Sequence, residues 1–226
     1  MLCGACGRVG FDVVASQPDG VDSRTSCLGA VNAAYVQSQC AGGPSATAQA
    51  TFLSDVQLGS LLVVAVNFTD IAQTPAVSDT LGSVFTAVSP PQRSSQQSSQ
   101  IWYAPVPSSG PDTVTVTFTT SASLGLYIHE FVGVNALDTF SVGNATGLTV
   151  AVPPITTLSP NEMLFVHCAQ LGQVTSTSAG FVVHETCTGD LSASRMAATP
   201  GTYGVDCTAL SSGMILVTLA AFERCP

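Results

Sequence analysis

Three histidines, two of them followed by a glutamate, are the side chains in this sequence best suited to acid–base or metal chemistry. The pairs are His129-Glu130 and His184-Glu185, and His167 stands in an apolar segment. A metal site would require all three imidazoles on adjacent strands. Successive residues of a strand point to opposite faces, so His129 and Glu130 cannot enter one site without a β-bulge. We therefore expect His129 and His167 to be semi-buried among the apolar side chains of their strands, and we predict no metal and no cofactor.

Glu130 is the strongest catalytic candidate because it lies on the apolar face of its predicted strand. That face also carries Leu126, Ile128 and Val132. A buried carboxylate must be hydrogen-bonded or protonated. With Glu185 or Asp138 about 5–9 Å away, Glu130 could cleave a glycosidic bond. We favour the alternative, in which Glu130 accepts hydrogen bonds from Arg195 or from loop amides and fixes a corner of the fold.

Other catalytic motifs are missing from the sequence. It contains no Gly-x-Ser-x-Gly elbow, phosphate-binding loop or dinucleotide fingerprint. Cys3-Gly4-Ala5-Cys6 has the spacing of a redox dithiol, but that chemistry needs a strand–helix context, and Gly, Asp, Ser and Pro follow here. We therefore predict that the protein is not an enzyme.

Eight cysteines are typical of a chain that folds in an oxidising, extracellular compartment. We predict the disulfides Cys187–Cys207, Cys27–Cys40 and Cys168–Cys225, although spacing alone does not determine connectivity. The first would close a loop of about 20 residues and stabilise the fold by about 3 kcal/mol. Cys3 and Cys6 remain for a lipid, for each other or for another subunit.

Three aromatic residues and two asparagines are candidates for contact with sugars. Trp102, Tyr103 and Tyr203 could line a sugar-binding face, but alternation leaves at most one of Trp102 and Tyr103 outward, and we expect the lone tryptophan in the core. Asn67 and Asn144 match the N-glycosylation pattern. Asn144, in a predicted Gly-rich loop, is the better candidate because Asn67 lies in an apolar strand.

The composition argues against several partners. Only 8% of the 226 residues are charged, no lysine is present, and the net charge is −9. Such a chain would repel nucleic acid and gains nothing from anionic lipid. No apolar run reaches the length of about 18 residues that a transmembrane helix needs. We predict a polar, uncharged surface that associates with copies of itself or with a surface glycan.

Short apolar segments separated by turn residues predict an all-β fold. Residues 113–119 alternate strictly between threonine and apolar residues, which predicts a strand with one buried face. Residues 61–68 are nearly all apolar and predict a central strand. Further strands are expected at 84–88, 100–104, 124–134, 148–152, 163–169, 181–186, 202–207 and 214–222, with weaker candidates at 28–37 and 46–53. We predict an antiparallel β-sandwich over residues 27–226, disulfide-supported and jelly-roll-like, preceded by a leader, linker or assembly arm at 1–26.

The N-terminus resembles that of bacterial lipoproteins. Residues 2–6 resemble the end of a lipoprotein signal, and residues 6–12 resemble the mature start of lipoproteins of myxobacteria and their relatives. The match departs from a signal because only five residues precede Cys6. The resemblance implies a lipid anchor on Cys6.

A series of weak motifs, in order, resembles a jelly-roll-like β-sandwich repeat domain of secreted bacterial and phage-associated proteins. The motifs occupy residues 59–63, 79–85, 102–104, 130–133, 160–164, 201–203 and 220–222. The resemblance spans residues 27–224 or so and implies display, adhesion or carbohydrate contact, without catalytic residues.

The sequence therefore predicts an extracellular or cell-surface structural or adhesive protein, which could assemble into a filament or coat. The first alternative is a carbohydrate-binding module of a secreted protein. The second is a glycan-cleaving enzyme that uses Glu130.

Overall fold

The computed structural model describes residues 32–69 and 72–226, and β-strands form nearly all of its regular structure. The first half contains β1 Ala34–Thr51, β2 Leu61–Phe68, β3 Ala76–Asp79, β4 Thr86–Ala87, β5 Gln92–Arg93, β6 Ser98–Pro105 and β7 Thr113–Val132. The second contains β8 Val134–Ala151, β9 Ile155–Thr157, β10 Glu162–Gln170, β11 Val174–Thr177, β12 Val182–Glu185, a 3₁₀ turn at Cys187–Gly189, β13 Leu191–Ala197, β14 Gly201–Tyr203 and β15 Asp206–Arg224. The predictions for residues 1–26, Cys3, Cys6 and Cys27 lie outside the described residues.

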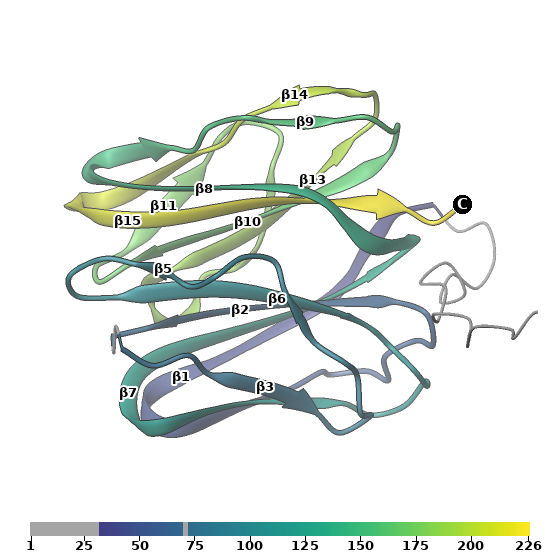
Figure 1. Cartoon of the computed structure of the whole chain (residues 1–226), viewed down its shortest axis with the longest axis horizontal. Coiled ribbons are helices and arrows are strands. Elements are labelled where there is room, and N and C mark those ends of the chain that lie inside the picture. The colour runs from purple at the N-terminus through teal and green to yellow at the C-terminus, as the bar shows by residue number, and fades with distance from the viewer. Residues whose placement is uncertain (1–31, 70–71) are drawn as a thin grey trace, which may run out of the picture.

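The two halves form two antiparallel sheets with the same strand order (Figure 1). The first sheet has the order β1-β7-β2-β6-β4, with β3 also paired to β7 and β5 to β6. The second has the order β8-β15-β10-β13-β12, with β11 also paired to β15. The ribbon of β9 and β14 matches an isolated bridge between Val56 and Gly110 in the first half. The predicted antiparallel β-sandwich is confirmed.

Alternating side chains of the central strands supply separate cores. In β2, Leu61, Val63 and Ala65 contribute to the cluster between the two sheets. The residues between them, Leu62, Val64 and Val66, contribute to a second cluster inside the first half. β10 is likewise buried along its whole length and contributes to both the shared cluster and a third core inside the second half. The prediction that residues 61–68 form a central strand is confirmed, since β2 lies between β6 and β7.

Each sheet folds over its own core because its longest strand bends. In β7 the register with β1 shifts between Ser45 and Thr47, and in β15 the register with β8 shifts between Thr208 and Gly213. Extra residues on one strand of a pair bend that strand and increase its twist. The segments predicted as separate strands at 113–119 and 124–134 are therefore one strand, β7. Sequence patterns missed β13 and most of β8, which are held by pairing with β10 and β15.

The predicted disulfide pairs Cys187–Cys207, Cys27–Cys40 and Cys168–Cys225 are wrong. Cys40 in β1 is bonded to Cys187, with Cα atoms 6.3 Å apart, and Cys168 in β10 is bonded to Cys207, with Cα atoms 6.1 Å apart. Cys225 is disulfide-bonded as well. The bend of β15 brings its first residues back over β10, so Cys207 meets Cys168 in the core of the second half. Cys187 meets Cys40 because its turn lies against β1 of the other sheet.

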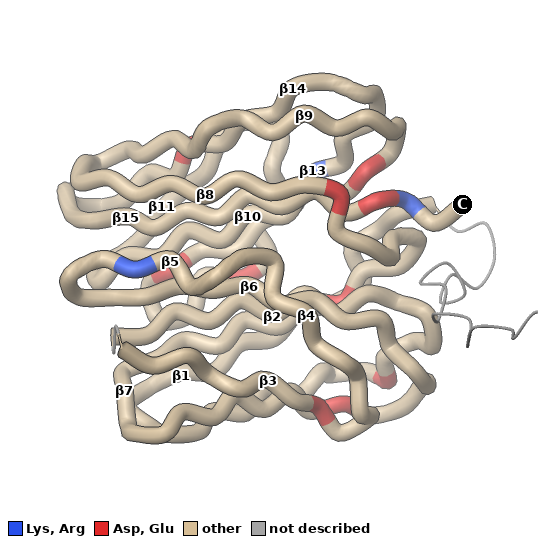
Figure 2. The backbone as a smooth tube through the Cα atoms, viewed as in Figure 1, with Lys and Arg blue, Asp and Glu red and all other residues tan. Residues whose placement is uncertain are grey.

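The surface carries few charges. Figure 2 shows long stretches of both sheets without any charged residue, as the composition predicts. Within residues 32–69 and 72–226, no helix has the length and apolar character needed to cross a membrane. Disulfides between described cysteines are typical of chains that fold in an oxidising compartment.

Candidate functional site

All three histidines lie along the interface between the two sheets, which we call the seam. His129 in β7 and His167 in β10 are fully buried, and His184 in β12 is half-buried. The ring centroids of His129 and His184 are 6.1 Å apart, and the ring of His167 packs at 5.0 Å from that of Tyr127. In the part of the chain that the structure describes, no cluster of three or more His, Cys, Asp or Glu side chains could hold a metal ion.

A serine–histidine pair lies at the centre of the seam. The Oγ of Ser192 lies 2.7 Å from Nε2 of His129, whose Nδ1 lies 3.3 Å from the carbonyl oxygen of Val63. Because a carbonyl only accepts hydrogen bonds, Nδ1 carries the proton and Nε2 accepts from the serine. This resembles the contact that activates a nucleophile, but both side chains are completely buried. The pair joins β7 to β13 across the seam.

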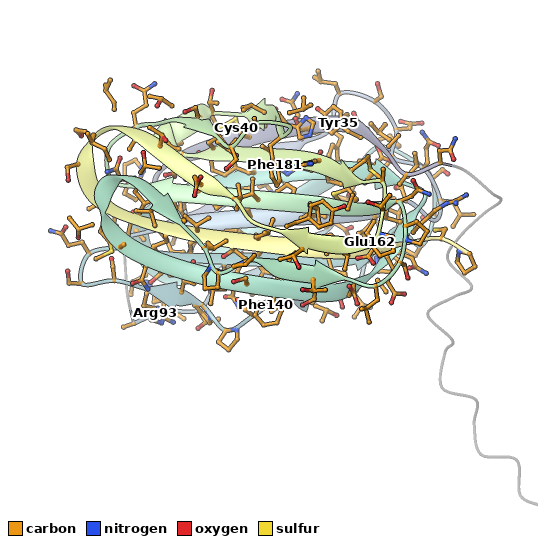
Figure 3. The ribbon with its side chains drawn as sticks, turned by 90° about the horizontal axis from the view of Figure 1, so that it is seen from above. Tyr35, Cys40, Arg93, Phe140, Glu162 and Phe181 are labelled. Atoms are coloured by element: carbon orange, nitrogen blue, oxygen red, sulfur yellow. A yellow bond between two sulfur atoms is a disulfide. The ribbon has the colours of Figure 1, made fainter. Side chains whose placement is uncertain are left out.

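A β-bulge in β12 lets His184 and Glu185 both contact β1. Strict alternation of side chains along the strand would point them to opposite faces. The register of β12 with β13 shifts between Val183 and Glu185. The ring of His184 stacks on Tyr35 at 3.8 Å, while Glu185 accepts a 2.7 Å hydrogen bond from Ser38 Oγ. Figure 3 shows Tyr35 along the same edge of the molecule as Cys40. β12 is therefore attached to β1 through stacking and a hydrogen bond, close to the Cys40–Cys187 disulfide.

Burial keeps the seam histidines neutral. It lowers the pKa of His129 and of His167 to about 3 and that of His184 to about 4. An unfolded histidine has a pKa of about 6.5. Between pH 6.5 and 4 the unfolded chain therefore binds protons that the folded chain does not, and the histidines lower stability as the pH falls.

Replacing His167 with phenylalanine should reduce the fall in the free energy of unfolding as the pH is lowered. In the described residues no side chain bonds the ring of His167, whose polar contact is with the backbone of Leu191, so the variant leaves no polar side chain without its partner. We expect the difference in unfolding free energy, variant minus wild type, to grow by up to about 1.4 kcal/mol per pH unit from pH 6 to pH 4. Urea unfolding at several pH values measures it. Asp190, whose pKa burial raises to about 7, acts in the opposite direction but cancels in this comparison. Parallel curves for the two proteins would contradict the prediction.

Glu130 is completely buried, and its carboxylate is bound by the β1–β2 loop and by β1. Its carboxylate accepts hydrogen bonds from Gln57 N at 2.7 Å, Ser60 Oγ at 2.8 Å and Gln37 Nε2 at 2.7 Å. Two of these donors belong to the β1–β2 loop, in line with our favoured interpretation. Of the two alternatives, Arg195 and the loop, the structure shows the loop, and Arg195 lies over Tyr203, 5.5 Å from the ring centroid.

The two glutamates do not form a glycosidase pair. Glu130 binds the side chain of Gln37 and Glu185 binds that of Ser38. Neighbouring residues of β1 point to opposite faces of the sheet. The two carboxylates therefore lie on opposite faces, and they cannot flank one glycosidic bond.

The three candidate aromatics pack on three different cores. Trp102 is buried in the core of the first half, as expected, and Tyr103 contacts Phe222 in the seam with ring centroids 5.5 Å apart. Tyr203 packs against the core of the second half, and its hydroxyl donates to Thr199 O at 2.6 Å. The three do not form one continuous face for a sugar ring.

The two glycosylation motifs differ in exposure. Asn144 is exposed, but it lies on β8 rather than in the predicted loop, because the Gly-rich segment pairs with β15. Asn67 lies near the end of β2 with a buried, unpartnered Oδ1. Of the two asparagines, Asn144 is the more accessible.

Sequence reasoning missed a polar cleft at the end of the seam. A cavity of about 260 Å³ is lined by the polar residues Ser94, Gln96, Gln97, Gln170, Ser211 and Ser212, together with Leu171 and Met214. A smaller cavity of about 90 Å³ shares Gln97, Gln170 and Leu171 with it. We call the two together the cleft. Its lining comes in part from the segment after β5 and from the bend of β15. Figure 1 shows β5 and this bend at the end of the molecule opposite the C-terminus. The Ser- and Gln-rich run at 94–100 is the only local signal of it.

Glutamine side chains hold the two walls of the cleft together. Gln97, from the first half, donates from Nε2 to Ala169 O at 3.3 Å and to Met214 O at 3.0 Å, both in the second half. Gln170 donates from Nε2 to Ser211 O at 3.0 Å, and its backbone amide donates to Asp190 Oδ1 at 2.7 Å. The cleft is therefore preformed by the packing of the two sheets.

Comparisons of the chain with protein-family models, with curated proteins and with solved structures found no match.

Proposed function

We propose that this protein is an extracellular or cell-surface module with a structural or adhesive role and no catalytic activity. The observation that carries the proposal is the seam. His129 bonds Ser192 and Glu185 bonds Ser38 across the two sheets. Glu130 holds the β1–β2 loop within the first half. Ser192 and His129 are completely buried, and Glu130 and Glu185 lie on opposite faces. The Cys40–Cys187 disulfide closes the same interface covalently, which suits a protein outside the cell.

The surface composition supports the same proposal. The exposed faces carry Thr, Ser and Asn with few charges, and nothing on them favours a polyanion. The strand-rich, cross-linked body suits a display or coat component that must stay folded without chaperones. Lipid attachment at the N-terminus would be one route to the cell surface.

The proposal is tested by location and by assembly in cells that produce the protein. We expect an antibody against the purified chain to label intact cells or the culture medium, and external protease to remove the cell-bound signal. Regular polymers in electron micrographs would support a structural subunit. Adhesion of beads coated with native chain, but not with reduced and unfolded chain, would support an adhesin. A chain confined to the cytosolic fraction would overturn the proposal.

A further inference from the structure

We propose that the cleft is a binding site for a neutral, hydroxyl-rich ligand, namely a single sugar residue of a surface glycan. The inference rests on the proposed adhesive function and supplies its contact point. Ligand pockets of drug-sized molecules span about 300–1,000 Å³ and are common where two packed units meet. The main cavity, of about 260 Å³, lies at such a junction and suits a smaller ligand.

The residues that line the cleft disfavour a charged ligand. No Asp, Glu, Arg, Lys or His is among the described residues that line either cavity. Arg93, next in sequence to Ser94, directs its guanidinium to Gln73 O at 2.7 Å and Ser98 Oγ at 3.1 Å. Asp190 stands behind Gln170 and is completely buried. An ionised ligand would therefore lose its hydration without gaining an opposite charge.

One hydrogen-bond acceptor at the cleft, Oε1 of Gln170, has no partner in the described residues. Gln170 is only 5% exposed and lines both cavities, yet its Oε1 has no hydrogen-bond partner in the described residues. Its Nε2 is bound to Ser211 O, so the amide is held in one orientation. Buried polar atoms are nearly always paired, and an exception needs an explanation. Oε1 is buried in the unbound chain, so a ligand hydroxyl that donates to it has to displace the atoms that cover it, and it then supplies the missing partner.

The remaining residues that line the cleft suit the other hydroxyls of a sugar ring and its apolar C–H face. Ser211 and Ser212 are exposed at the bend of β15 and can both donate to and accept from ring hydroxyls. Leu171 is 56% exposed beside them, and Met214 lies in the same wall. Together they offer an apolar patch for the C–H face of the ring. The cleft thus combines fixed amides, free hydroxyls and a small apolar surface without any aromatic platform.

The test is an NMR titration of the ¹⁵N-labelled full chain with glucose, galactose, mannose and N-acetylglucosamine, and with glucuronate as the charged comparison. We expect at least one neutral sugar to shift the side-chain amide signals of Gln97 and Gln170 in a saturable way, and glucuronate to bind more weakly. Leu171→Arg places a long charged side chain on the cleft and should weaken binding at least about 10-fold. Gln170→Met, which removes the acceptor, should weaken it as well.

The matched control is Leu158→Arg, the same substitution at a leucine that is 80% exposed and lines neither cavity of the cleft. It should bind like the wild type. The inference is overturned if no sugar shifts these amides, if the shifts map elsewhere, or if Leu158→Arg and Leu171→Arg lose binding equally. Surface labelling of cells tests the proposed function separately. A protein that is found at the cell surface but binds no sugar in the cleft would contradict the sugar site and leave the proposed function standing.

Discussion

Removing the disulfide between the two sheets should lower the free energy of unfolding by about 3–5 kcal/mol. Cys40 and Cys187 are 147 residues apart in the sequence, so their bond closes most of the described chain into one loop. In the chain-entropy model a loop of this length restricts the unfolded chain by about 5 kcal/mol. Urea unfolding of the Cys40→Ser/Cys187→Ser variant measures the loss. The slope of the unfolding curve should also rise, because the released chain exposes more surface.

The two single variants provide the control. Either substitution alone removes the same cross-link, so Cys40→Ser, Cys187→Ser and the double variant should lose nearly equal stability. Effects that instead add up in the double variant would assign the loss to the local contacts of each side chain. A loss below about 1 kcal/mol, the size of one ordinary hydrogen bond, would show that the seam does not depend on the bond.

Glu130→Gln should destabilise the fold by about 2–3 kcal/mol, even though it changes one atom of the side chain. The carboxylate accepts from three donors, and the amide of the variant would place its own donor against one of them. Gln37 cannot turn its amide to compensate, because that side chain also donates to Ser54 O and accepts from Ser54 N. Urea unfolding gives the loss, and faster hydrogen exchange at the Gln57 amide would locate it.

Glu185→Gln is the matched control for this substitution. Glu185 is half-buried, and Ser38 Oγ is a donor that can rotate to suit an amide oxygen. We expect a loss below about 1 kcal/mol. If both variants lost the same stability, burial and the loop contacts of Glu130 would not be the cause.

Local patterns were sufficient to predict the class of fold and the faces of its strands. Strict alternation predicted that Val114, Val116 and Phe118 are buried while Thr117 and Thr119 are exposed, and the structure confirms both. The same rule correctly predicted that His129 and Glu130 point to opposite faces. These predictions succeed because the period of two is a property of the extended backbone itself.

Strand lengths and pairings could not be predicted in the same way. β8 is exposed or half-buried along most of its length and contains Gly143 and Gly147, and it is a strand because β15 offers hydrogen-bond partners along most of its length. The sequence patterns also did not reveal that the two halves repeat one strand order. Residues 61–68 and 163–170 occupy equivalent places but share an apolar character rather than an obvious motif.

The sequence by itself determined that this protein is an antiparallel, disulfide-bearing β-sandwich whose strands alternate buried and exposed side chains. Only the tertiary structure decided which cysteines pair, how the bulge aims His184 and Glu185, and that Gln97 and Gln170 form a cleft. The physical reason is the range of the interactions. Side-chain alternation is set between neighbours in the chain, whereas Cys40 meets Cys187, and Gln97 meets Met214, only through the bends of β7 and β15 and the packing of one sheet on the other.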